Sequence, residues 1–356
     1  MRIHRNIIIA FIIIKDSVYT GFIKSLLTLS TVTLTTPVFQ GCEMSTHPMD
    51  GDFTEETKTT SVKLAVHQPP ETRIRTLDAF VYNDDALKRI DSYQRSEDLS
   101  DGEVMIGSCG GKKIVVLCAN AQWEDIELED VYSLQNAATL KADLENEDIS
   151  RPVMSALAHI DAGSQTVISL ERLSSEIELR SVRSDFSGKP YDGEYITDAR
   201  AYLTNVNATY RIISGEEDLI ERIINHRSLI QDDILNLKSR SIILDSIGTI
   251  TSRHTYPGIR FLCYPNTTEE ESLGTPFTRL VLEGKIQGET FYWPININRG
   301  CGTGHEGIER NRRYVYDIII KSKGTKDPDI PIIPYMAETL FETDKWIEKE
   351  PYHVTF

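Results

Sequence analysis

The chain contains 356 residues and has a mass of 40.3 kDa, which predicts two domains that each bury a core of their own. Hydrophobic residues make up 40% of it and charged residues 26%, a composition that excludes disorder along the whole chain and a polytopic membrane protein. With 38 basic and 54 acidic residues the net charge is -16. Nucleic acid is therefore excluded as a main partner, because phosphate binding depends on lysine and arginine.

Residues 1–42 have the pattern of an export signal. Arg2 and Arg5 precede a short apolar run, and a second run follows Lys24 and ends in Gly41-Cys42. Neither run reaches the roughly 18 residues of a membrane-spanning helix. A basic start and a short apolar core are typical of a signal peptide. We therefore predict a signal peptide over 1–42, with a true start near Lys24 as an alternative.

The Gly41-Cys42 pair resembles a bacterial lipobox, in which the cysteine thiol receives a diacylglycerol. Phe39 in place of the usual leucine and Gln40 before the glycine depart from that pattern. Cys42 is accordingly the predicted lipidation site, and its lipid the predicted anchor in the outer membrane. The alternative is an incidental cysteine beside an uncleaved anchor. Residues 43–60, rich in Thr, Glu, Asp, Pro and Gly, predict a flexible tether.

The body of the chain predicts strands separated by turns. Apolar residues alternate or run continuously at 62–66, 75–82, 114–119, 176–180, 277–286, 290–297 and 314–320. Gln287-Gly288 predicts the turn of a hairpin. Helical periodicity is confined to about 125–145 and 216–237, where we expect surface helices.

These elements predict a mostly-β protein of two β-sandwiches with a few surface helices. We place the N-terminal sandwich at 61–188 and the C-terminal sandwich at 189–356. The boundary lies near the glycine-rich and proline-rich segment 188–193, or somewhat before it.

Motifs that could support catalysis are weak. Residues 302–307 fit the bare string G-x-G-x-x-G, but the alternating residues that follow predict a strand, whereas a pyrophosphate site needs a helix there. The sequence contains no H-x-x-x-H, C-x-x-C or G-x-S-x-G pattern. We therefore predict no enzyme activity, no metal site and no cofactor.

Two further patterns concern local structure. Asp327 and Asp329 flank Pro328, which predicts a stiff turn whose carboxylates cap backbone groups. Four cysteines beyond the signal segment could pair in an oxidising compartment, and their connectivity stays open: Cys109, Cys118, Cys263 and Cys301.

The order of several segments is more specific than any one of them. The segments are Leu77–Asn83, Gly111–Ala121, Pro152–Ser155, Ile168–Arg172, Glu176–Leu179, Arg200–Asn205, Phe291–Ile297, Arg310–Tyr314, Gly324–Asp329 and Tyr352–Phe356. In this order they resemble the fimbrillin superfamily, the type V pilus subunits and fimbrial anchor lipoproteins of Bacteroidales. The likeness covers about 60–356, together with the lipobox.

The resemblance implies two transthyretin-like β-sandwiches, export as a lipoprotein and a place in a surface fimbrium that supports adhesion. Other fimbrial subunits are the implied partners. In stalk members an Arg-specific protease removes the first strand, and a C-terminal strand of the next subunit fills the groove by β-augmentation. Carried onto this sequence, the removable strand is about 61–68, the candidate cut sites are Arg73 and Arg75, and the donor is about 338–356.

Only Thr76 separates Arg75 from Leu77, where the second strand is expected to begin. A protease needs extended, accessible backbone, so this short spacing favours a base or minor accessory subunit over a stalk subunit. Outward-facing strand charges are the alternative for Arg73 and Arg75.

The alternative function is a surface lipoprotein that binds glycan or protein ligands through exposed loops. Its candidate contacts are Tyr191, Tyr195 and Tyr256, although packing is the commoner fate of a tyrosine. An exchangeable terminal strand discriminates the two functions, because a binding module needs none.

Overall fold

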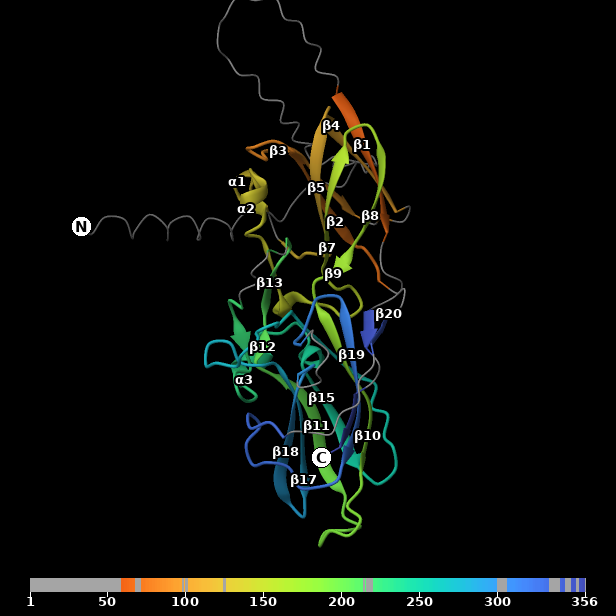
Figure 1. The fold of residues 1–356 in the computed structure, drawn as a ribbon, viewed down its shortest axis with the longest axis vertical. Coiled ribbons are helices and arrows are strands. Elements are labelled where there is room, and N and C mark those ends of the chain that lie inside the picture. Colours follow the sequence, from red (N-terminus) through yellow and green to blue (C-terminus); the bar gives the residue numbers. More distant parts are fainter. Residues whose placement is uncertain are drawn as a thin grey trace, which may run out of the picture. The chain divides into compact units, whose positions relative to one another are not determined.

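In a computed structural model the chain is mostly β (Figure 1). The structure describes residues 59–67, 72–97, 99, 102–123, 126–213, 215, 220–299, 306–332, 340–342, 347–349 and 352–355. Within this part of the chain, no helix is long and apolar enough to cross a membrane.

The first sandwich consists of a five-stranded and a three-stranded sheet. In spatial order, the five strands are β3 (Ile90–Glu97), β2 (Thr76–Asn83), β5 (Lys112–Ala119), β7 (Met154–Asp161) and β9 (Glu171–Arg172). The three are β4 (Glu103–Cys109), β1 (Thr59–His67) and β8 (Gln165–Ser169). Apolar side chains of both sheets form one buried cluster between them.

Strand β5 is buried on both faces, as its continuous apolar run predicted. Val115 and Leu117 belong to the cluster that it shares with the three-stranded sheet. Val116 and Cys118 belong to a second cluster, which also contains side chains of the one-turn helices α1 (Leu128–Val131) and α2 (Leu134–Ala137).

The second sandwich has a six-stranded and a four-stranded sheet. The path of the first is β16 (Ile259–Cys263), β10 (Ser175–Ser184), β19 (Arg312–Ile320), β21 (Ile347–Lys349) and β20 (Leu340–Glu342), and β22 (Tyr352–Thr355) also pairs with β19. The other contains β15 (Leu244–Ile250), β11 (Ile196–Thr204), β17 (Arg279–Ile286) and β18 (Glu289–Asn296). Buried side chains of both sheets share one cluster. The predicted fold of two sandwiches is thus confirmed.

The boundary at 188/189 stays a prediction. Strand β10 precedes it in sequence and pairs with β16 and β19 of the six-stranded sheet. Sheet membership therefore groups β10 with the second sandwich.

Short elements complete the fold. Strand β6 (Lys141–Asp143) pairs with β13 (Thr209–Arg211), and β12 (Val206–Asn207) pairs with β14 (Ile223–Ile224). The remaining helices are α3 (Gln231–Leu235) and the 3-10 turns η1 (Leu144–Asn146) and η2 (Arg240–Ile242).

The helix predicted over 216–237 is wrong. The described part of that range contains β14, a loop and the short α3. Asn225 has a left-handed φ of 50°, and its backbone N–H donates to the Asp233 carboxylate at 2.7 Å, which ends any helix there. Ile224 is buried and pairs with Val206, so a non-local ladder overrides the helical spacing. The predicted helix at 125–145 is likewise reduced to α1, α2 and η1.

The predicted hairpin between β17 and β18 is confirmed. Gln287 and Gly288 have φ values of 54° and 83°, and positive φ at both central residues is the mark of a type I′ turn.

Candidate assembly site

Strand β1 lies in the middle of the three-stranded sheet. Figure 1 shows it beside β4 and β8. It pairs antiparallel with β4, where Leu64 is opposite Val104, and parallel with β8, where Val66 is opposite Ile168. Leu64 is 0% exposed and Val66 8%. We call the space that β1 fills between β4 and β8 the β1 slot. Removal of β1 would expose an apolar row and two strand edges together, as β-augmentation requires.

Strand β4 is also attached to the five-stranded sheet, independently of β1. The buried carboxylate of Asp91 on β3 accepts hydrogen bonds from Ser108 Oγ at 2.6 Å and from the Cys109 backbone N–H at 3.0 Å. Lys113 Nζ, on β5, lies 3.1 Å from the same oxygen. These contacts would hold one wall of the β1 slot when β1 is absent.

The candidate cleavage segment lies between β1 and β2. Arg73 and Arg75 are exposed and outside any strand, while Ile74 between them is buried. They are therefore not strand charges. Strand β2 starts at Thr76, so the short spacing expected after Arg75 is confirmed.

A single amide side chain fixes this segment. Asn120, directly after β5, has a φ of 61° and is 7% exposed. Its Oδ1 accepts from the Arg75 backbone N–H, and its Nδ2 donates to the Arg73 carbonyl, both at 2.9 Å. Nδ2 also donates to the Pro152 carbonyl at 3.1 Å. The backbone on either side of Ile74 is thereby attached to the five-stranded sheet.

The predicted donor stretch is paired within its own chain. Strands β21 and β22 pair parallel with β19, and β20 pairs antiparallel with β21. In this state β19 is covered on one side by β10 and on the other by the C-terminal strands.

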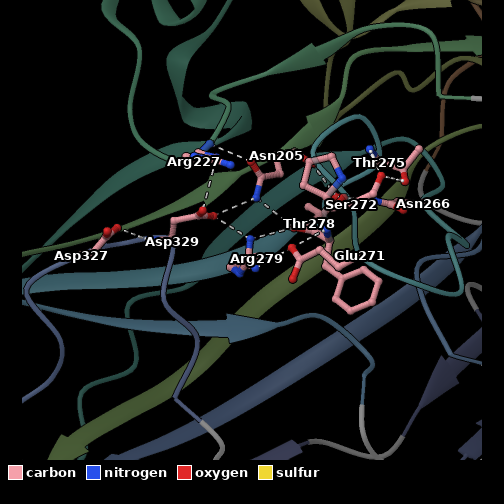
Figure 2. Close-up of polar contacts among 12 residues, drawn as sticks. Asn205, Arg227, Asn266, Glu271, Ser272, Thr275, Thr278, Arg279, Asp327 and Asp329 are labelled. Carbon is pink, nitrogen blue, oxygen red and sulfur yellow. Dashed lines mark hydrogen bonds and ion pairs between the residues drawn. The ribbon is translucent and has the colours of Figure 1, made fainter.

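A buried polar network joins Arg279, at the start of β17, to Asp329, which precedes the C-terminal strands in sequence (Figure 2). The Arg279 side chain is 3% exposed, and its guanidinium bridges Asp329 at 2.8 Å and Glu271 at 2.6 Å. Asn205, at the end of β11, donates to the Phe277 carbonyl at 3.1 Å and accepts from the Arg227 backbone N–H at 2.7 Å.

At the turn predicted at 327–329, the Asp329 backbone N–H donates to Asp327 Oδ1 at 2.9 Å, whereas the Asp329 carboxylate pairs with Arg279 and caps no backbone group of a described residue. Its partner Arg279 was missed. The available signal was an arginine directly before the apolar run Leu280–Leu282.

No protein-family model and no curated protein matches the chain. Solved structures do resemble it. The fimbrilin FimA of Porphyromonas gingivalis superposes with a TM-score of 0.56 at 16% identity, over 83% of this chain and 96% of its own. A candidate cell adhesion protein of Bacteroides eggerthii gives 0.57 at 16% identity, over 77% and 92%. Another, of Parabacteroides distasonis, gives 0.55 at 14%, over 78% and 91%. The chain has the fimbrillin fold.

The three tyrosines named from the sequence differ in this fimbrillin fold. Tyr191 is half-buried, packs edge-to-face on Phe186 with ring centroids 5.0 Å apart, and accepts a hydrogen bond from the Lys323 backbone N–H at 3.2 Å. Tyr195 and Tyr256 are exposed, and Tyr256 stacks on His254 with centroids 6.1 Å apart. Tyr191 therefore has a packing role, and the other two are available to a partner.

The cysteines that the structure describes form no disulfide. Cys42 and Cys301 lie outside the described residues. Cys118 and Cys263 are buried thiols without a disulfide, and burial raises the pKa of Cys263 to about 12. Among the residues that the structure describes, no group of three or more His, Cys, Asp or Glu side chains could hold a metal ion.

Proposed function

We propose that the chain is a structural or anchoring subunit of a bacterial surface fimbrium, assembled by β-strand complementation and supporting adhesion. The observation that carries this proposal is the place of β1. It is the first described strand, and yet it lies between β4 and β8 with Leu64 and Val66 in the core. Such a strand can be exchanged for a donor of the same pattern without rebuilding either sheet. The fimbrillin fold supports the same function.

The proposed place is the outer membrane, with a lipid on Cys42 and the tether 43–60 holding the body away from the bilayer. Removal of the signal segment takes away four basic residues and one acidic residue and leaves a net charge of -19. Anionic lipid repels such a chain, so a lipid on the cysteine would have to hold it there.

Among fimbrial roles, the geometry favours a base or accessory subunit that keeps β1. Arg75 is one residue from β2, and Asn120 hydrogen-bonds the backbone of both candidate cut sites. A protease that binds extended backbone would have to break these bonds first.

The test starts from a chain that begins at Glu43, treated with an Arg-specific protease and run on a denaturing gel with and without heating. A ladder that heat abolishes, with the cut at Arg73 or Arg75, is expected of a subunit completed by strand exchange. A chain that is cut but never forms such a ladder with itself or with fimbrial partners would refute strand exchange. An uncut monomer would leave the anchor role or the ligand-binding lipoprotein.

Asn120→Ala makes this test sharper. The variant loses its two hydrogen bonds to the candidate cleavage segment, each worth about 1 kcal/mol. The fraction of molecules in which this segment is detached from the sheet should therefore rise roughly tenfold or more. The rate of cutting at Arg73 and Arg75 should rise by the same factor, as measured by mass spectrometry over time. Asn236→Ala, an exposed asparagine after α3, is the matched control. Equal rates in all three chains would show that Asn120 does not guard the segment.

Cys42→Ala tests the anchor. If the thiol carries the lipid, the variant should leave the detergent phase and accumulate as unprocessed precursor or soluble protein, because the acyl chains supply the membrane affinity. Detergent partitioning that the substitution leaves unchanged would contradict the lipidation of Cys42.

The second candidate function is ligand binding by a surface lipoprotein. It is favoured by the exposed Tyr256, which is 72% exposed, and by Tyr195, 55% exposed. Exposed aromatic rings are common contacts for glycans and proteins. Binding to a glycan array that Tyr256→Ala abolishes, in a chain that never exchanges β1, would support this function instead.

A further inference from the structure

Basic side chains converge around two adjoining cavities beside the segment that follows β1. The cavities have volumes of about 270 and 450 Å³ and share Arg75, Glu97 and Arg151 in their linings. We call them together the basic cavity. Its basic lining residues are Arg73, Arg75, Arg95, Arg151 and Lys238, and its acidic ones Glu97 and Asp148. The excess of positive charge is notable in a chain whose net charge is -16.

Three of these cations are uncommitted, and the exposed Arg73, which has no ion pair with a described residue, is one of them. Arg75 and Lys238 are exposed and make no ion pair with another described residue, whereas Arg151 Nη2 lies 2.9 Å from Asp148 Oδ2. Arg95 is partly engaged, with its Nε 3.8 Å from Asp78 and its Nη1 3.4 Å from the Trp123 carbonyl. An incoming carboxylate could therefore pair with Arg75 and Lys238 without breaking an existing ion pair.

The basic cavity adjoins the core around β1. Ile74, which lines it, belongs to the same buried cluster as Leu64 and Val66. A strand that enters the β1 slot from another subunit would thus bring its flanking residues toward these cations.

The C-terminal stretch has the opposite charge. Between 338 and 350 it contains five acidic residues, Glu338, Glu342, Asp344, Glu348 and Glu350, against the two lysines Lys345 and Lys349. Two copies of this acidic chain repel one another, so a local region of opposite sign would favour their association.

We propose that the basic cavity is the docking site for the acidic C-terminal segment of a second copy of this chain. This inference rests on the proposed function and deepens it, because it assigns a contact between subunits beside β1, both in a subunit that keeps β1 and before strand exchange in one that loses it. A cut after Arg73 would preserve the positive charge, whereas a cut after Arg75 would lower it by one. A cut after Arg73 leaves Arg75 in place, and a cut after Arg75 replaces both arginines by the α-ammonium of Thr76, which also lines the cavity.

The experiment measures binding of a fluorescent peptide, residues 338–356, to the intact chain by anisotropy. At about 0.01 M salt, where the Debye length is about 30 Å, we expect saturable binding that is lost at about 1 M. Arg75→Glu with Lys238→Glu should weaken it roughly tenfold or more, and so should a peptide whose five acids are replaced by amides. The control, Lys189→Glu with Arg253→Glu, has the same change of charge at exposed positions elsewhere and should stay within about twofold.

Several outcomes would overturn the proposal. They are no binding by the intact chain, equal affinity for the amide-substituted peptide, equal loss in the control variant, or inorganic phosphate occupying the cavity where the peptide does not bind. Failure here is distinguishable from failure of the proposed function. The distinguishing chain carries Arg75→Glu and Lys238→Glu and is cut after Arg73. If it still forms heat-sensitive ladders at the wild-type rate, only the docking site is refuted.

Discussion

Replacing both carboxylates around Arg279, as Glu271→Ala with Asp329→Ala, is expected to lower the free energy of unfolding by about 3–5 kcal/mol. The Arg279 side chain is 3% exposed and makes its ion pairs with these two residues, at 2.6 and 2.8 Å. Without them a buried guanidinium would lack a counter-charge, and that desolvation penalty exceeds the loss of an exposed pair. Urea denaturation of the double variant checks the size.

Two further chains isolate the cause. Adding Arg279→Met to the double variant should recover part of the loss, because an apolar side chain of similar length needs no counter-charge. Glu289→Ala removes the carboxylate of the exposed Lys326–Glu289 pair, whose side chains are 61% and 65% exposed, and should cost less than about 1 kcal/mol. A double variant no less stable than Glu289→Ala would contradict the importance of the network.

The network also has a functional consequence. Asp329 lies shortly before the C-terminal strands, which we propose as the donor. Its ion pair with Arg279 therefore holds the segment before these strands against the four-stranded sheet (Figure 2). In the double variant we expect faster proteolysis after residue 329 than within β17, because local opening would begin at the released turn.

Glu147→Gln is expected to flatten the dependence of stability on pH. Glu147 is 1% exposed, and burial raises its pKa from 4.5 to about 7, although Val153 N–H and Tyr264 Oη donate hydrogen bonds to it at 3.2 and 3.0 Å. Because the folded-state pKa is the higher one, the stabilising effect of the protonated group is complete below pH 4.5. It is lost as the pH rises to about 7.

The size follows from the shift. The wild-type chain should lose about 3 kcal/mol across this window from Glu147 alone, at about 1.36 kcal/mol for each pH unit. Burial also raises the pKa of Asp78 and Glu176, so the difference between wild type and Glu147→Gln is the quantity to measure, by urea denaturation at pH 5 and pH 8. Glu270→Gln, at an exposed position, is the control. Parallel pH profiles for wild type and Glu147→Gln would contradict this assignment.

Local patterns in the sequence predicted the local structure well. The hairpin at Gln287-Gly288 is confirmed because its turn depends on two adjacent residues that accept positive φ. The doubly buried β5 is confirmed because a continuous apolar run can satisfy two cores at once. The helix over 216–237 was wrong because Ile224 pairs with Val206, and local spacing does not contain that partner.

The candidate assembly site also combines features that the sequence predicted with features that it did not. The alternating strand at 62–66 and the turn at Asp327–Asp329 came from residue patterns, whereas Arg73, Arg75 and the C-terminal donor stretch came from the resemblance to fimbrillins. The strand and the turn follow from neighbours within a few residues, whose alternation and turn chemistry act locally.

Only the tertiary structure decided what these pieces do together. It placed β1 between β4 and β8, joined Asn120 to the backbone of Arg73 and Arg75, paired Arg279 with Asp329, and brought Arg75 and Lys238 to one cavity. These partners are separated by tens of residues or more. Their meeting depends on strand order and on the burial of a common core, which no local periodicity records.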